Sequence, residues 1–287
     1  SAATPRLIYC SVSGYGREGA VKSRLGYDPV VQAESGLMSV NGFPDREPVR
    51  SGVPIVDVTT GMPACQGVLA ALFARERTGK GQYLEVALFD VGIALTVHYG
   101  IGYLAAGVNP GRAGNGSPAA EPIGVFQARD GIFQMTMAGE RVWRKLCNDV
   151  IKRPDLIDDP DFADNTARLK NHVRLHRILN EIFQTDTRDA WVEKLRAGGA
   201  PGGPVRSIAE AMDSDEVKQR GLVSRIPHGK LGTIPNLNSP IRLAMTPVGA
   251  AVGAPTLGEH TDAVLRGRLG LTPDEIQHLK AVKAIPA

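Results

Sequence analysis

The sequence predicts an α/β protein in which a large α/β part is followed by a smaller α+β domain. Strand-like and helix-like patterns alternate over residues 1–107, as they do where helices cover a mostly parallel sheet. The glycine- and proline-rich stretch 108–122 interrupts this alternation, and a hairpin pattern with several helical patterns follows it. A second cluster of helix breakers at 198–204 ends the smaller domain.

We therefore expect three parts along the chain. A chain of 287 residues is long enough for two domains with separate cores. The last part is expected to return to the large domain. The ranges are 1–115 for the large α/β part, 116–204 for the small α+β domain and 205–287 for the C-terminal return.

In the large part, residues 6–13 are apolar and β-rich and predict a buried strand, and residues 53–58 predict a second one. The helix after the second strand is expected to begin near Thr60, because Pro63 fits a first turn and not a helix interior. Gly79 is a natural C-cap for that helix. The other expected elements are a helix at 27–38, a strand at 82–88 and a helix at 90–107.

The second part begins with a hairpin, because the turn residues 129–131 separate two strand-like stretches at 124–128 and 132–137. Thr272 and Glu275 have the spacing of a capping box, which predicts the start of a helix. The remaining expected elements are helices at 140–151, 164–184, 187–197, 259–268 and 272–282, and strands at 222–226 and 241–244.

Composition excludes several classes of function. With 43% hydrophobic and 22% charged residues and a net charge of +3, the chain predicts a soluble protein that binds no nucleic acid. Its apolar stretches are interrupted before they reach spanning length, so we expect no contact with a membrane. The three cysteines are widely spaced and lack a C-x-x-C pair, which favours a cytoplasmic protein without disulfides or zinc. The chain begins abruptly and without methionine, so we expect a truncated chain.

Three other patterns resemble known sites only in part. Residues 14–19 form a literal G-x-G-x-x-G after a strand, but no helix opens at the third glycine, which favours a tight turn over a dinucleotide site. His172 and His176 have i, i+4 spacing, yet the arginines around them favour a basic surface, and we expect no metal. Residues 77–82 resemble part of a phosphate loop but fit a helix end and a turn better.

The stretch 53–61 is an apolar, β-branched run with one carboxylate, Asp57, in its middle. An unpaired buried carboxylate is costly, so Asp57 must be solvated, hydrogen-bonded or used. An aspartate at a strand–helix junction is most often a helix N-cap. A helix start near Thr60 instead places Asp57 just ahead of the helix, where the dipole favours the ionised form. An ionised, partly desolvated carboxylate is also a competent nucleophile toward activated acyl groups.

Seven segments follow one another along the chain: PRLIYCSVSGYG, GYDPVVQAESGLM, GVPIVDVTTGM, LAALFARERTGKGQYLEVALFD, GRAGNG, AGGAPGGPV and LGEHTDAVL. In this order and spacing they resemble the family III CoA-transferases, the CaiB/BaiF group of formyl-CoA and carnitine CoA-transferases. The resemblance implies that family's fold, with a Rossmann-like large domain, a smaller α+β domain and an interlocked homodimer. It also implies that the usual N-terminal segment of the large domain is missing here.

The aspartate of the VPIVD-type segment is the nucleophile in that family, and the resemblance places it at Asp57. It implies a CoA-transferase that moves CoA between an acyl-CoA thioester and a small free carboxylic acid. The expected intermediates are an aspartyl anhydride and an aspartyl-CoA thioester. Coenzyme A or acyl-CoA is then a substrate, and no permanently bound cofactor is expected.

Two further sites follow from the resemblance. One matches a family stretch that contacts CoA, and its residues are Arg24, Leu25, Gly26, Tyr27 and Asp28. Arg24 can pair with a phosphate there, or it is simply a surface arginine before a helix. The other matches the family's glycine-rich flap over the active site and consists of Gly114, Asn115 and Gly116. Because the sequence that follows is poor in glycine, the acyl specificity stays open.

Two alternatives use the same fold. An α-methylacyl-CoA racemase would need a histidine in the segment before the first helix, and residues 25–28 contain none. A non-catalytic protein that binds CoA would keep the fold without acyl exchange. A covalent CoA adduct on Asp57 would separate a transferase from both.

Overall fold

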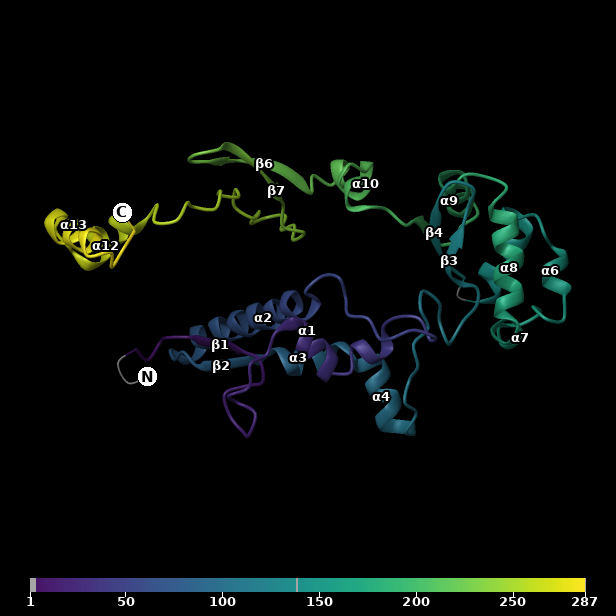
Figure 1. Cartoon of the computed structure of the whole chain (residues 1–287), viewed down its shortest axis with the longest axis horizontal. Helices are drawn as coiled ribbons and strands as arrows, with labels where there is room; N and C mark the ends of the chain where they lie inside the picture. The colour runs from purple at the N-terminus through teal and green to yellow at the C-terminus, as the bar shows by residue number, and fades with distance from the viewer. Residues whose placement is uncertain (1–3, 138, 287) are drawn as a thin grey trace. The chain divides into compact units, whose positions relative to one another are not determined.

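The computed structural model describes residues 4–137 and 139–286. The chain divides into two compact units, one ending at Val205 and the other beginning at Arg206 (Figure 1). The first unit contains two separate apolar cores, one in its α/β part and one in the small domain. The division into 1–115, 116–204 and 205–287 stays a prediction, as does the return of the last part to the large domain.

The α/β part is built on two parallel strands, β1 (Tyr9–Ser13) and β2 (Tyr83–Ala87), which pair over their full length. A parallel pair needs a long crossover connection, and α2 (Ile55–Thr78) supplies its helix. The core of this part is small and centres on Val31 and Val56, neither of which is exposed to solvent. The other helices are α1 (Asp28–Glu34), the short 3₁₀ turn η1 (Met38–Val40), α3 (Leu88–Leu95) and α4 (Val97–Ala106).

Helix α2 begins earlier than the sequence predicts, so the expected strand at 53–58 is wrong. The helix runs from Ile55 and contains Pro63 in its interior, where proline leaves the carbonyl of Thr59 without its helical donor. The hydroxyl of Thr59 bonds back to the carbonyl of Ile55 at 2.5 Å. The helix ends at Gly79 as predicted, with the left-handed φ of 71° that glycine tolerates.

The expected single helix at 90–107 is two helices, α3 and α4, which meet at Thr96 with a bend of 72°. In the described residues α2 alone is long and apolar enough to cross a membrane, and α3 with α4 qualifies only as a bent pair. One such helix is weak evidence for a membrane span. The absence of membrane contact therefore stays a prediction.

The small domain packs helices against a three-stranded antiparallel sheet in the order β3-β4-β5. The predicted hairpin is confirmed as β3 (Ile123–Gln127) and β4 (Ile132–Thr136), and β5 (Gly202–Pro204) comes from the expected breaker cluster. The core includes Phe126, Phe133, Phe183, Trp143 and Trp191. The helices are α5 (Glu140–Lys145), the π-helical turn η2 (Leu146–Val150), α6 (Asp155–Asp158), α7 (Asn165–Lys170), α8 (His172–Phe183) and α9 (Arg188–Ala197).

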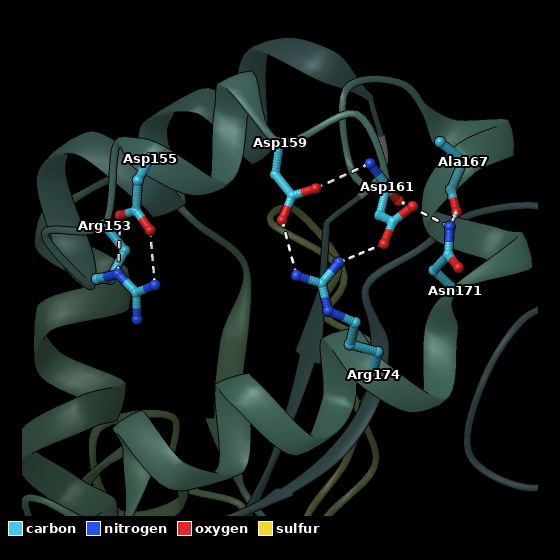
Figure 2. Close-up of polar contacts among 7 residues, drawn as sticks. All are labelled: Arg153, Asp155, Asp159, Asp161, Ala167, Asn171 and Arg174. Carbon is cyan, nitrogen blue, oxygen red and sulfur yellow. Dashed lines mark hydrogen bonds and ion pairs between the residues drawn. The ribbon is translucent and has the colours of Figure 1, made fainter.

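Charged side chains tie the connection between α6 and α7 to the start of α8 (Figure 2). Arg174 of α8 donates to Asp159 at 3.0 Å and also to Asp161. Its guanidinium carbon lies 4.8 Å from the ring centre of Phe162. The backbone N–H of Asp161 and then Arg174 lower the pKa of Asp159. Every group in this network has a protein partner, so we assign it to the scaffold of the small domain.

The second unit contains a hairpin, β6 (Val223–His228) with β7 (Gly232–Leu237). The strand expected at 241–244 is therefore wrong, because 232–237 pairs with β6 after a turn closed by Gly232 at a φ of 70°. The capping box of Thr272 and Glu275 is confirmed at the start of α13 (Pro273–Ala281). The other helices are α10 (Ile208–Met212), α11 (Asp215–Gln219) and α12 (Thr261–Leu269).

Candidate active site

The N-terminus of α2 is capped by a carboxylate from another helix. Asp28, in the first turn of α1, is only 4% exposed, and its Oδ2 accepts hydrogen bonds from the backbone N–H groups of Val56 at 2.7 Å and Asp57 at 3.2 Å. The residue at the N-cap position is Pro54, which offers no side-chain acceptor. Asp28 therefore satisfies two of the donors that a helix start leaves open, and its charge complements the helix dipole.

A buried glutamine extends this cap to the segment before α2. Gln32 has no exposed surface and donates from Nε2 to Asp28 Oδ1 at 2.5 Å. Its Oε1 accepts from the backbone N–H of Ser51 at 2.8 Å. Each end of the Gln32 amide has a partner, so the orientation of its side chain is fixed. The sequence places Asp28 among residues that contact CoA, whereas the structure uses its carboxylate inside the protein.

Asp57 lies in the first turn of α2, and it is neither the N-cap nor outside the helix. Its side chain is exposed, which differs from the partly desolvated carboxylate that we expected. Within the described part of the chain its carboxylate takes part in no hydrogen bond or ion pair. Because Asp28 holds its backbone N–H, the position of Asp57 is fixed while its carboxylate stays free to react.

The glycine turn after β1 packs against the segment that leads into α1. A Cβ on Gly14 would lie 2.8 Å from the Cα of Gly26, and one on Gly26 would lie 2.7 Å from the Cα of Gly14. This contact requires glycine at both positions. No helix opens at Gly19, because residues 17–23 form bends and turns. The predicted tight turn is confirmed.

Arg24 is held by neighbours in the protein. Its guanidinium forms an ion pair with Glu34 of α1 and lies 4.5 Å from the ring centre of Tyr15. The hydroxyl of Tyr15 donates to the other oxygen of Glu34 at 2.8 Å. Burial raises the pKa of Tyr15, and the hydrogen bond to Glu34 raises it further. A phosphate that binds Arg24 would have to share its guanidinium with Glu34. Leu25 and Tyr27 beside it are exposed.

The loop of Gly114, Asn115 and Gly116 contacts the segment that follows η1. The N–H of Gly114 donates to the carbonyl of Gly42 at 2.9 Å, and that of Gly116 donates to Ala113 at 3.0 Å. Among the described residues the N–H of Asn115 has no acceptor. The structure connects this loop to Asp57 only through intervening residues.

Two cavities flank the first turns of α2. One of about 330 Å³ is lined by Gln32, Ser51 and Ile55 among others. Another of about 660 Å³ lies between α2, β2 and α3, and Thr59 and Asp90 contribute to its wall. Ile55 and Thr59 lie one turn apart on the same face of α2, and Asp57 lines neither cavity.

The described residues contain no group of three histidine, cysteine or acidic side chains that could hold a metal ion. The rings of His172 and His176 are 6.5 Å apart. Nε2 of His176 lies 2.8 Å from the buried carboxylate of Glu121, and a proton between these two atoms satisfies both. His176 therefore serves the small domain.

The residues that position Asp57 could not be recognised from the sequence. Gln32 and Ser51 belong to this set, and neither has a motif of its own. One signal was present: a glutamine four residues after an aspartate on a helix brings the two side chains together.

The chain is similar to known proteins over most of its length. The family model described as CoA-transferase family III matches residues 1–261. A succinate–glutarate CoA-transferase of Agrobacterium fabrum is 34% identical over 91% of this chain and 65% of its own length. A human succinyl-CoA:glutarate CoA-transferase is 30% identical over 91% of this chain and 60% of its own length. The chain thus spans about 60–65% of the length of these curated relatives.

Solved structures superimpose on most of this chain. A CAIB/BAIF family protein from Brucella suis superimposes with a TM-score of 0.81 at 34% identity, covering 92% of this chain and 68% of that one. Rv3272 from Mycobacterium tuberculosis superimposes with a TM-score of 0.78 at 29% identity, covering 89% of this chain and 68% of that one. The mixed α/β fold that the sequence predicts is confirmed by these matches.

Proposed function

Because the chain belongs to CoA-transferase family III, we propose that it carries the nucleophile of an enzyme that moves CoA from an acyl-CoA thioester to a small free carboxylic acid. One observation supports this most directly: the Asp57 carboxylate is exposed and unpaired, while Asp28 holds its backbone in place. The names of similar proteins support the proposal, since they include CoA-transferases that act on glutarate and on oxalate.

The proposed reaction begins when an oxygen of Asp57 attacks the thioester carbonyl. The C–S bond breaks, a mixed anhydride forms on Asp57 and CoA leaves as a thiolate. The thiolate then attacks the aspartyl carbonyl of the anhydride, which releases the donor acid and leaves an aspartyl-CoA thioester. The acceptor carboxylate attacks that thioester and expels the CoA thiolate again. Attack of the thiolate on the acceptor carbonyl gives the new acyl-CoA and frees Asp57.

Each step passes through an oxyanion that needs a hydrogen-bond donor. In the steps that involve the acceptor acid we assign this role to the glycine loop, and within it to the N–H of Asn115, because those of Gly114 and Gly116 already donate inside the protein. For CoA itself we propose the surface of residues 24–27. The exposed side chains of Leu25 and Tyr27 suit the apolar parts of the cofactor, and Arg24 suits a phosphate.

A racemase has less support than a transferase. It would need a histidine in the segment before the first helix, and residues 25–28 contain none.

We also propose that the active protein is a homodimer in the cytoplasm. Helix α2 leaves Met62, Leu69 and Phe73 more than half exposed, at 56%, 59% and 62%. Exposed apolar side chains in a row on one helix favour a protein contact. The three cysteines are all free, which suits a reducing compartment. Light scattering during gel filtration tests the dimer, and the mass of a single chain at micromolar concentration would contradict it.

The nucleophile is tested by trapping the adduct on protein made from the complete gene. The protein is incubated with succinyl-CoA, acetyl-CoA or formyl-CoA, denatured in acid and digested, and the peptide that contains Asp57 is examined by mass spectrometry. We expect a CoA adduct on this peptide and none in Asp57→Asn. Asp274→Asn is the matched control, since Asp274 is also an exposed aspartate in the first turn of a helix. An undiminished adduct in Asp57→Asn would rule out the assignment.

A further inference from the structure

Arg112 binds a loop that precedes α2. Its guanidinium donates to three backbone carbonyls, those of Phe43 at 3.0 Å, Pro44 at 3.3 Å and Arg46 at 2.7 Å. In the stretch 41–50 only Gly42 is even partly buried. Because apolar burial contributes little there, these hydrogen bonds hold the loop against the rest of the protein.

The same loop holds the glycine loop. The N–H of Gly114 donates to the carbonyl of Gly42, and a Cβ on Gly114 would lie 2.7 Å from the ring of Phe43. Gly114 also has a φ of 58°, so a side chain is excluded by both contact and conformation. The hydrogen bond from Gln134 to the carbonyl of Asn115 is longer, at 3.4 Å.

The other end of the loop is connected to the turn that carries Asp57. Asn41 and Val49 close the loop by two hydrogen bonds, of 2.8 Å and 3.1 Å. Two residues further on, the N–H of Ser51 is held by Gln32, which in turn holds the capping carboxylate of Asp28. A continuous series of hydrogen bonds and short covalent segments thus runs from the first turn of α2 to the glycine loop.

We propose that Arg112 is a positioning residue that fixes the glycine loop relative to Asp57, and that the choice of acceptor acid depends on it. The dependence of the acceptor acid on Arg112 rests on the proposed function. The position of the glycine loop depends on the geometry of the protein alone. If the N–H of Asn115 meets an oxyanion at the Asp57 site, a displacement of about 1 Å at the loop is enough to weaken that contact. Loss of the Arg112 contacts would then impair the acyl-acceptor steps without removing the nucleophile.

The test compares Arg112→Lys with Arg46→Lys in protein made from the complete gene. Lysine keeps the positive charge but cannot reach three carbonyls in the geometry of a guanidinium. Arg46 lies in the same loop and contributes its carbonyl, which Arg46→Lys leaves in place. Hydrogen exchange of peptides that cover 41–49 and 111–117 is measured first, without substrate. The kcat and KM for succinate, glutarate and oxalate and the rate of Asp57 acylation in a single turnover are measured next.

We expect exchange in both peptides to rise roughly tenfold in Arg112→Lys, because the lost hydrogen bonds held the loop closed. We expect kcat/KM for the best acceptor acid to fall by a similar factor, mainly through kcat, and the order of acceptors to change, while acylation of Asp57 stays within about twofold. Equal exchange in the two variants would overturn the positioning role. Increased exchange with unchanged kcat/KM values for the acceptors would overturn the link to specificity. If the unaltered protein forms no adduct, the proposed function fails, whereas the exchange result still decides whether Arg112 holds the loop.

Discussion

The cap on α2 leads to a prediction about hydrogen-bond polarity. In Asp28→Asn the amide oxygen can still accept from the N–H groups of Val56 and Asp57. Its NH₂ group then faces the NH₂ group of Gln32, which the structure aims at Asp28. Rotating the Gln32 amide by half a turn only moves the clash, because its NH₂ group would then face the N–H of Ser51. One buried donor is left without an acceptor in either arrangement.

The magnitudes follow from these contacts. Leaving one buried donor unpaired costs about 1–3 kcal/mol, so Asp28→Asn should weaken this region by about 2 kcal/mol. Asp28→Ala leaves two N–H groups of α2 without an acceptor and removes the charge at the helix start, which together cost about 3 kcal/mol. Combining Asp28→Asn with Gln32→Glu restores every pairing, because a carboxylate at position 32 accepts from both neighbours. The double variant should recover at least about 1 kcal/mol.

The assay must report on the start of α2 separately from the small domain. Both tryptophans of the chain, Trp143 and Trp191, belong to the core of the small domain, so intrinsic fluorescence follows that domain and serves as an internal control. Hydrogen exchange of a peptide spanning 53–61 reports on the start of α2. We expect it to accelerate roughly thirtyfold in Asp28→Asn and more than a hundredfold in Asp28→Ala, since each 1.4 kcal/mol is a factor of ten. A double variant no slower than Asp28→Asn would refute the polarity argument.

Two further predictions concern the small domain. Burial raises the pKa of the Cys147 thiol from 9.0 to about 12, so Cys147 should resist iodoacetamide at pH 8 in the folded protein while the exposed Cys65 reacts, as peptide mass spectrometry can measure. The pKa of this thiol is higher in the folded protein than in the unfolded chain, so the buried thiol contributes stability below pH 9 that is lost as the pH rises through about 12. The urea midpoint should therefore fall less across that pH range in Cys147→Ala. Arg168 is fully buried and donates to the carbonyls of Glu121 at 2.9 Å and Phe162 at 3.0 Å, so Arg168→Met should lower the free energy of unfolding of this domain by about 3 kcal/mol. An unchanged urea midpoint by tryptophan fluorescence would contradict that estimate.

Local patterns predicted the elements whose ends are set by nearby residues. The hairpin of the small domain follows from its turn residues 129–131, the end of α2 from Gly79 and the start of α13 from its capping box. Each of these signals acts within a few residues, so the sequence alone contains it.

The start of α2 was not predictable in this way. A proline in the ninth position of a helix and a β-branched run before it both favour a strand at 53–58, and local rules alone support that choice. The structure differs because Asp28, far away in the sequence, supplies the acceptor that an early helix start needs. The local structure that the sequence predicts around Asp57 was therefore wrong, and the role of Asp57 as the nucleophile stays a prediction. The role of Arg112 was missed for the same reason, since its partners are about seventy residues earlier in the chain.

The contact between Gly14 and Gly26 has a consequence for protein engineering. A directed-evolution library over residues 14–28 would treat the two positions as independent, yet a methyl group at either one collides with the backbone of the other. No second substitution at the partner can make room, because glycine already has the smallest side chain. A library aimed at the proposed CoA surface should therefore vary the exposed Leu25 and Tyr27 and keep both glycines unchanged.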